Sequence, residues 1–175
     1  MTSDSGPSAA QGDPVDVIVD QWVAVRPDLD TRTIEVFGRL HRLARTMDDR
    51  MEKAFTRFGI SRGEFDVLAA LRRAGESYTL SPRRLSAALM LTTGGMTGRL
   101  DKLERAGLLR RSPDPHDRRA LQVTLTEPGL RIVDDAMGVA MAVQTAALSA
   151  LTDEQAGQLA GLLRDLLAEA HTERP

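Results

Sequence analysis

Residues 91–129 read LTTGGMTGRLDKLERAGLLRRSPDPHDRRALQVTLTEPG, and they carry the clearest structural pattern in the chain. Thr92 is suited to cap a helix that repeats apolar residues at three- and four-residue spacing and ends near Gly107. Two short apolar segments follow, residues 108–112 and 120–125, with the turn-rich loop PDPHDRR between them. The stretch therefore predicts a helix followed by a β-hairpin with a basic tip.

The residues immediately before this stretch predict two more helices. Residues 81–90 begin with Ser-Pro, which is typical of a capped first helical turn. About three residues separate this short helix from the one at Thr92, as in a helix-turn-helix. Residues 61–73 begin with a capping-box pattern, Ser61 and Glu64, and contain the apolar run of a core helix.

Further outward, the pattern is helical on both sides. Residues 1–12 are rich in Ser, Gly, Pro and Ala and predict a flexible tail. Residues 13–25 and 30–58 predict a short and a long amphipathic helix, and residues 126–150 and 152–170 predict two helices after the hairpin. The expected fold class is mainly α with a small β-hairpin wing.

Composition excludes several classes of protein. The chain has 175 residues, 42% hydrophobic and 27% charged, with no Cys and no apolar run of the roughly 20 residues that span a bilayer. It lacks the motifs of nucleotide-binding loops, zinc proteases, nucleophile elbows and dinucleotide folds. His41, His116 and His171 fall in three different predicted elements, so no metal site is expected. We expect a cytoplasmic protein that is not an enzyme and needs no cofactor.

The charge is unevenly distributed. A formal net charge of −2 would ordinarily count against a nucleic-acid partner. Residues 83–119, however, contain nine basic and four acidic residues, a local charge of +5, which leaves −7 for the remainder. The segment predicted to hold the helix-turn-helix and the hairpin can therefore attract DNA, while the acidic remainder limits indiscriminate binding.

The predicted helix after Thr92 carries two glycines and Lys102 on the face opposite its apolar residues. Gly94 and Gly98 each cost about 1 kcal/mol relative to Ala inside a helix. Close approach of another surface would explain them, and free amides at the helix N-terminus attract phosphate. The alternative is an ordinary surface helix.

The predicted hairpin tip is the second feature suited to DNA. His116, Arg118 and Arg119 lie at the end of a projecting loop, where an Arg can enter the minor groove. Asp117 is expected to orient a neighbouring guanidinium through a charge-assisted hydrogen bond. Taken alone, this loop is better explained as a solvated charged turn, and only the adjacent helix-turn-helix favours a role in DNA binding.

The same stretch resembles the signature of MarR-type winged helix-turn-helix regulators. The most specific part is the coupling of TTGG to RLDKLERAGLL, then to the wing residues Asp117 and Arg119 and the LT that begins the next helix. The resemblance covers residues 30–170. It implies a homodimer, joined through N- and C-terminal helices, that binds palindromic operators in double-stranded DNA and represses until a small ligand binds.

Carried onto this chain, the resemblance assigns regions and residues. It implies a tail at 1–12, N-terminal dimerisation helices at 13–60, a DNA-binding domain at 61–125 and C-terminal dimerisation helices at 126–172. It places the following residues on DNA, the first two at phosphates: Arg83, Arg84, Thr92, Thr93, Thr97, Lys102, Arg118 and Arg119.

Two residues near this domain are unusual for their positions. Arg99 lies on the flank of its predicted helix and is expected to point back into the protein. Asp66 interrupts the apolar run GEFDVLAAL and should have a partner. The only Trp, Trp22, lies on the additional N-terminal helix.

This combination resembles the urate-responsive, PecS-like branch of the MarR family. The matching text is QWVAVRPDLD, GEFDVL and GRLDKLERAGLLRR. The resemblance implies a small anionic effector, urate or a related purine such as xanthine, bound by Trp22, Asp66, Arg99 and Arg111. A flat acidic heterocycle can stack on indole and pair with guanidinium groups, and its negative charge disturbs Asp66.

Each of these four residues also has a simpler explanation. Trp22 can be a core residue, Asp66 can favour its helix N-terminus, and the two arginines can contact phosphate. The alternative function for the whole chain is a helical dimerisation or adaptor protein with a winged-helix shape that binds protein instead of DNA.

Overall fold

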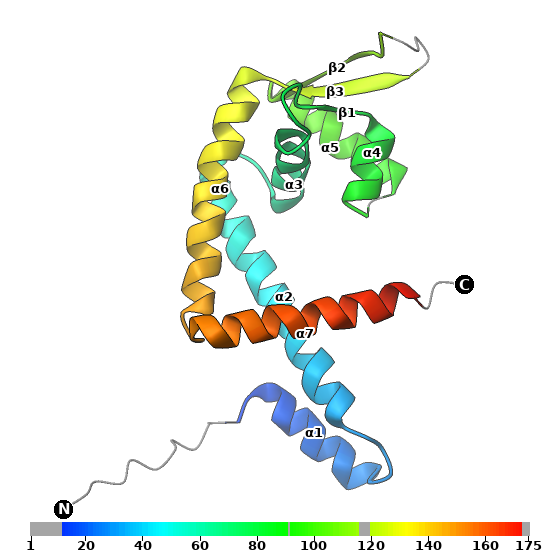
Figure 1. Cartoon of the computed structure of the whole chain (residues 1–175), viewed down its shortest axis with the longest axis vertical. Coiled ribbons are helices and arrows are strands. Elements are labelled where there is room, and N and C mark those ends of the chain that lie inside the picture. The colour runs from blue at the N-terminus through cyan, green and yellow to red at the C-terminus, as the bar shows by residue number, and fades with distance from the viewer. Residues whose placement is uncertain (1–11, 91, 116–119, 173–175) are drawn as a thin grey trace, which may run out of the picture. The chain divides into compact units, whose positions relative to one another are not determined.

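The computed structural model describes residues 12–90, 92–115 and 120–172, and the chain divides into two units, residues 1–49 and 50–175 (Figure 1). The described residues form helices and three short strands with these bounds: α1 (Pro14–Val25), α2 (Arg32–Phe55), the 3-10 helix η1 (Thr56–Phe58), α3 (Arg62–Arg72), β1 (Thr79–Leu80), α4 (Pro82–Ala88), α5 (Thr93–Arg105), β2 (Leu109–Pro113), β3 (Leu121–Leu125), α6 (Glu127–Leu148) and α7 (Asp153–Thr172).

The first unit joins α1 to the beginning of α2. Asp13 caps α1 and forms a capping box with Asp16. The guanidinium of Arg39 donates to Asp13 Oδ2 at 2.7 Å and also pairs with Asp16. Val15 is buried between the two helices because Gly38 leaves room for it. The N-terminal end of α1 is therefore fixed to α2.

The second unit begins with the last turn of α2. The sequence predicts one continuous helix to Phe58, but the α-helix ends at Phe55 and tightens into a 3-10 turn. Gly59 then adopts a left-handed conformation (φ 69°) that ends the helix. The rings of Phe55 and Phe65 stack at 4.4 Å between centroids, so the end of α2 packs on α3.

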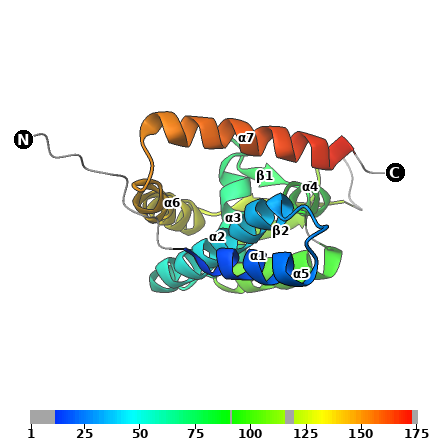
Figure 2. The same ribbon diagram turned by 90° about the horizontal axis from the view of Figure 1, so that it is seen from below.

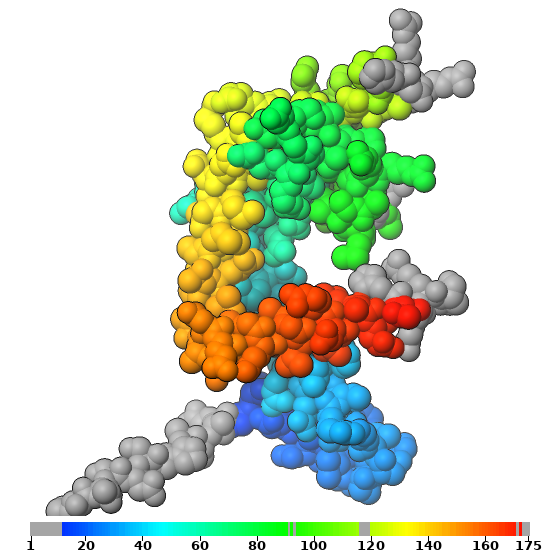
Figure 3. Space-filling view, viewed as in Figure 1, coloured from blue at the N-terminus to red at the C-terminus, as the bar shows by residue number. Residues whose placement is uncertain are grey.

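Helix α3 lies at the centre of the second unit. It begins at the capping box that the sequence predicts, in which Ser61 accepts from the Glu64 amide and Glu64 accepts from the Ser61 amide. Its apolar side chains are buried against α4, α5, α6 and β3, and the views in Figures 1 and 2 agree on this central place. In Figure 3 the segments coloured green to yellow form one continuous packed body.

The wing is a three-stranded antiparallel sheet in the order β1-β3-β2. The sequence predicts only a hairpin, which corresponds to β2 and β3, paired in register from Leu109 opposite Leu125 to Pro113 opposite Leu121. Strand β1 adds Thr79 opposite Thr124, and their hydroxyl groups lie 2.9 Å apart. A strand of two residues shows no alternation, which is why the pattern did not reveal it.

Helix α6 begins against the turn that joins α5 to β2. The Thr126 hydroxyl donates to Gly107 O at 2.7 Å, and the Thr126 amide donates to Leu108 O at 3.1 Å. Gly129 is buried in the first turn of α6, where its lack of a side chain allows the helix to approach Leu108. Among the described residues, each helix is either too short or too polar to span a lipid bilayer.

Candidate DNA-binding interface and effector residues

Helix α5 presents an open face beside a buried one. Thr92 caps it by accepting from the Gly95 amide at 3.3 Å, and the residues Met96, Leu100 and Leu103 are buried. On the other side, a Cβ atom built at Gly94 or Gly98 would meet no atom within 4 Å. Packing inside the chain therefore does not require these glycines, and the face remains available to another surface.

Helix α4 supplies the other half of the helix-turn-helix. Ser81 caps it by accepting from the Arg84 amide at 3.3 Å, and Leu85 anchors it in the core. Arg83 and Arg84 are exposed at its first turn. Both side chains are therefore accessible to a partner, and their assignment to phosphates stays a prediction.

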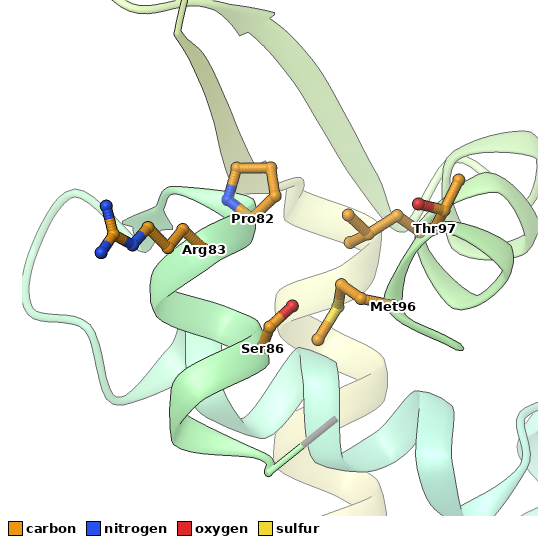
Figure 4. Close-up of a pocket in the computed structure, with 6 residues that line it drawn as sticks. Pro82, Arg83, Ser86, Met96 and Thr97 are labelled. Carbon is orange, nitrogen blue, oxygen red and sulfur yellow. The ribbon is translucent and has the colours of Figure 1, made fainter. Parts of the chain in front are cut away.

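A pocket of about 210 Å³ lies between α4 and α5. Figure 4 shows Pro82 and Ser86 of α4 facing Met96 and Thr97 of α5, whereas the guanidinium of Arg83 extends away from the pocket. Since Arg83 and Thr97 are both assigned to DNA, the pocket belongs to the candidate DNA interface.

The strands β2 and β3 lead toward the predicted tip of the wing. The Asp114 amide donates to Ala120 O at 2.9 Å, and the Gln122 side chain donates to Asp114 Oδ2 at 2.8 Å. The predicted tip residues lie outside the described part of the chain; these are His116, Asp117, Arg118 and Arg119. The side chain of Thr93 also lies outside it.

Lys102 does not stand alone on the exposed face where the sequence pattern places it. Its side chain is 61% exposed, yet its ammonium nitrogen lies 2.8 Å from Glu64 Oε1 of α3. Burial by itself would raise the pKa of Glu64, but the Lys102 ammonium and the Ser61 amide together hold that pKa below its ordinary value. Lys102 is therefore engaged with a carboxylate in this structure.

Arg99 turns back onto α3, as the helical wheel predicts. Its Nη1 atom lies 3.4 Å from Gly63 O, and its guanidinium covers Gly63 so closely that a Cβ there would lie 2.6 Å from Cζ. Asp66 has the partner that its position requires, Arg62, at 3.2 Å. Because Gly63 and Asp66 are three residues apart in α3, Arg99 rests on the face of α3 that carries Asp66.

Arg111 has different neighbours. From β2 its guanidinium reaches Asp101 Oδ1 at 2.7 Å and Glu104 Oε2, where its Nε atom donates at 2.8 Å. The hydrogen bond from the Arg111 guanidinium is the main reason why the pKa of Glu104 lies below its ordinary value. The partners of Arg111 thus belong to the second half of α5, and Arg111 is not paired with Gly63 or Asp66 of α3. Trp22 belongs to the first unit, where it is 43% exposed.

Sequence reasoning identified Glu64 as a helix cap but missed its role as the partner of Lys102. No linear pattern could have revealed this pair, because the two residues lie on different helices that only the tertiary fold brings together. Within the described residues, no group of three or more His, Asp or Glu side chains is arranged to hold a metal ion.

Comparison with known proteins gives consistent results. Residues 58–120 match the MarR family model. The chain is 38% identical to the HTH-type transcriptional regulator PecS of Dickeya dadantii, over 83% of this chain and 88% of PecS. It is similar in structure to an Escherichia coli MarR mutant complexed with operator DNA (TM-score 0.70, 25% identity, 78% and 96% of the two chains). AbsC from Streptomyces coelicolor shares the fold (TM-score 0.73, 23% identity, 83% and 99%).

Proposed function

Because the chain belongs to the MarR family of transcriptional regulators, we propose that it is a repressor released from a palindromic operator by a small anionic effector. The observation that carries the DNA-binding part is the open face of α5, where a Cβ added to Gly94 or Gly98 would meet none of the described atoms within 4 Å. Arg83 and Arg84 at the start of α4 would contact phosphates beside it. Residues 61–125 form the proposed DNA-binding domain.

The proposed repressor is a homodimer. Helix α7 supports this because it exposes large apolar side chains along its length, which a second copy of the chain would cover. These side chains are Leu159, Leu162, Leu166 and Leu167. We assign dimerisation to residues 13–60 and 126–172. Two DNA-binding domains would then read the two halves of a palindrome.

Arg119→Ala is expected to weaken operator binding about tenfold, because an Arg at the wing tip contributes about 1–3 kcal/mol when it is bound in a groove. A gel-shift titration measures this against the duplex that the purified protein selects from random DNA. The mass of the protein in solution should stay that of the wild type. Unchanged affinity would remove Arg119 from the DNA interface.

The proposed effector is urate or a related purine such as xanthine. Arg99 supports this proposal because it belongs to α5 while resting on α3 beside the Asp66 face. An anion that drew this guanidinium away from Gly63 would shift α5, so ligand and DNA would favour different positions of one helix. Trp22 and Arg111 are included by their match to the urate-responsive branch.

Titration of the protein–operator complex with urate, xanthine and small carboxylates tests the effector. Release by urate or xanthine below millimolar concentration is expected, accompanied by a change in the fluorescence of Trp22. Asp66→Asn should keep operator affinity and need at least tenfold more purine for release, because one hydrogen-bonding group to the ligand is altered. If none of these compounds releases the DNA at millimolar concentration, the purine proposal is wrong.

A further inference from the structure

Glu64 is the one charged residue that is buried in the described part of the chain, at 3% exposed. Both of its carboxylate oxygens are occupied. Oε2 accepts from the Ser61 amide at 2.8 Å, and Oε1 accepts from the Lys102 ammonium at 2.8 Å. A buried carboxylate needs such partners, because leaving one oxygen unpaired would carry the desolvation cost without compensation.

The pair connects two helices with different tasks. Glu64 lies in the first turn of α3, the central helix of the core, whereas Lys102 lies on α5, the helix whose open face is assigned to DNA. Three residues earlier on α5, Arg99 contacts Gly63, the neighbour of Glu64. Two cationic side chains from one face of α5 therefore end on consecutive residues of α3.

We propose that Glu64 and Lys102 form a positioning pair that sets the orientation of α5 on the core. Lys102 then serves DNA recognition by holding the helix through Glu64, and not by neutralising a phosphate itself. This inference rests on the proposed DNA-binding function and names two residues of the same site. Glu64 is an acidic residue beside a surface proposed to bind DNA, which is a polyanion. In this proposal its carboxylate nevertheless favours operator binding.

The sign of the effect of Glu64→Gln separates this proposal from simple electrostatics. Gln keeps an oxygen that accepts from the Ser61 amide, so the cap is retained, but it has no charge to hold Lys102. If Lys102 were a phosphate contact held back by Glu64, Glu64→Gln would bind DNA more tightly. If the pair positions α5, the same change weakens operator binding although it makes the protein more positive.

The experiment measures operator and random-sequence duplex binding over a series of salt concentrations for the full chain and three variants, Glu64→Gln, Lys102→Gln and the double variant. We expect each single variant to weaken operator binding about tenfold, and the double variant to be no weaker than either single one, since both remove the same interaction. Affinity for the random duplex should stay within twofold for Glu64→Gln. Thus the ratio of specific to random binding falls.

Glu127→Gln is the matched control, because it removes the same charge from an exposed pair with Arg131 at the start of α6. It should leave operator affinity unchanged. The proposal is overturned if Glu64→Gln binds the operator as tightly as the wild type or more tightly. It is equally overturned if Lys102→Gln lowers the slope of log affinity against log salt by about one, the value for one lost phosphate contact.

Thermal unfolding of each variant shows whether it is folded. If Glu64→Gln does not fold, Lys102→Gln alone decides, because an exposed lysine tolerates the change and its salt slope distinguishes the two roles. Failure of the wild-type chain to bind any selected duplex would overturn the proposed function, and this inference with it. Wild-type binding together with an unaffected Glu64→Gln overturns the inference only.

Discussion

Gly129→Ala is expected to lower the free energy of unfolding by at least about 3 kcal/mol. A Cβ at this position would lie 2.0 Å from Leu108 O and 2.9 Å from Leu108 C, both of which are backbone atoms. A side chain could rotate away, but this carbonyl is held in place because it also accepts from the Thr126 amide. The added methyl group therefore has to push α6 away from the α5–β2 turn, and the core on both sides loses contacts.

Gly138→Ala is the control for this substitution. It lies in the same helix, and a Cβ there would meet nothing within 4 Å. Because Ala favours a helix interior over Gly by about 1 kcal/mol, this variant should be as stable as the wild type or more stable. Urea denaturation followed by circular dichroism compares the two. Equal stability of Gly129→Ala and the wild type would show that α6 does not approach Leu108 this closely.

Gly98→Glu is expected to weaken operator binding at least a hundredfold while leaving the fold as stable as the wild type or more so. The position has open space around it, and Glu is a better helix former than Gly. On DNA, the new carboxylate would enter a groove lined by phosphates, where it is repelled and cannot be solvated. A substitution that raises the stability of the fold but lowers operator affinity is expected at a face that contacts DNA and does not pack within the chain.

Two further variants separate charge from bulk at this face. Gly98→Gln has nearly the same shape without the charge, and it should retain most of the affinity that Gly98→Glu loses. Gly138→Glu adds the same charge to α6 and should bind as the wild type does. Fluorescence anisotropy with a labelled operator duplex measures all three. If Gly98→Glu binds normally, the open face of α5 is not the surface that meets DNA.

The sequence predicted the helices well because their ends carry local chemical signals. Ser61, Ser81 and Thr92 cap helices as predicted, and Asp13 and Thr126 cap the helices predicted to begin near them. Local signals also explain two other predictions from the sequence. They are the inward orientation of Arg99 and the partner that Asp66 requires. Each is a conflict between a charged residue and its position on one helix, which a helical wheel displays.

The features that the sequence did not predict are those that depend on contacts between distant segments. Strand β1 exists because β3 offers it hydrogen bonds, and its two residues carry no pattern of their own. Lys102 pairs with Glu64, and Arg111 pairs with Asp101, across different elements of the fold. The spacing of residues along the sequence does not show which elements pack together. For the same reason the wheel placed Lys102 on the exposed face without showing that its charge was already matched.

The junction at Thr126 has a mechanical consequence. Two hydrogen bonds from Thr126 and the close approach of Gly129 tie the start of α6 to the end of the α5–β2 turn. Helix α6 has 22 residues and so acts as a rod about 33 Å long. If the far end of this rod is held in a dimer, a tilt of about 10° displaces the junction by about 6 Å, nearly two base-pair steps along DNA. In the proposed dimer, the angle of α6 would then set the operator half-site spacing that the protein can measure.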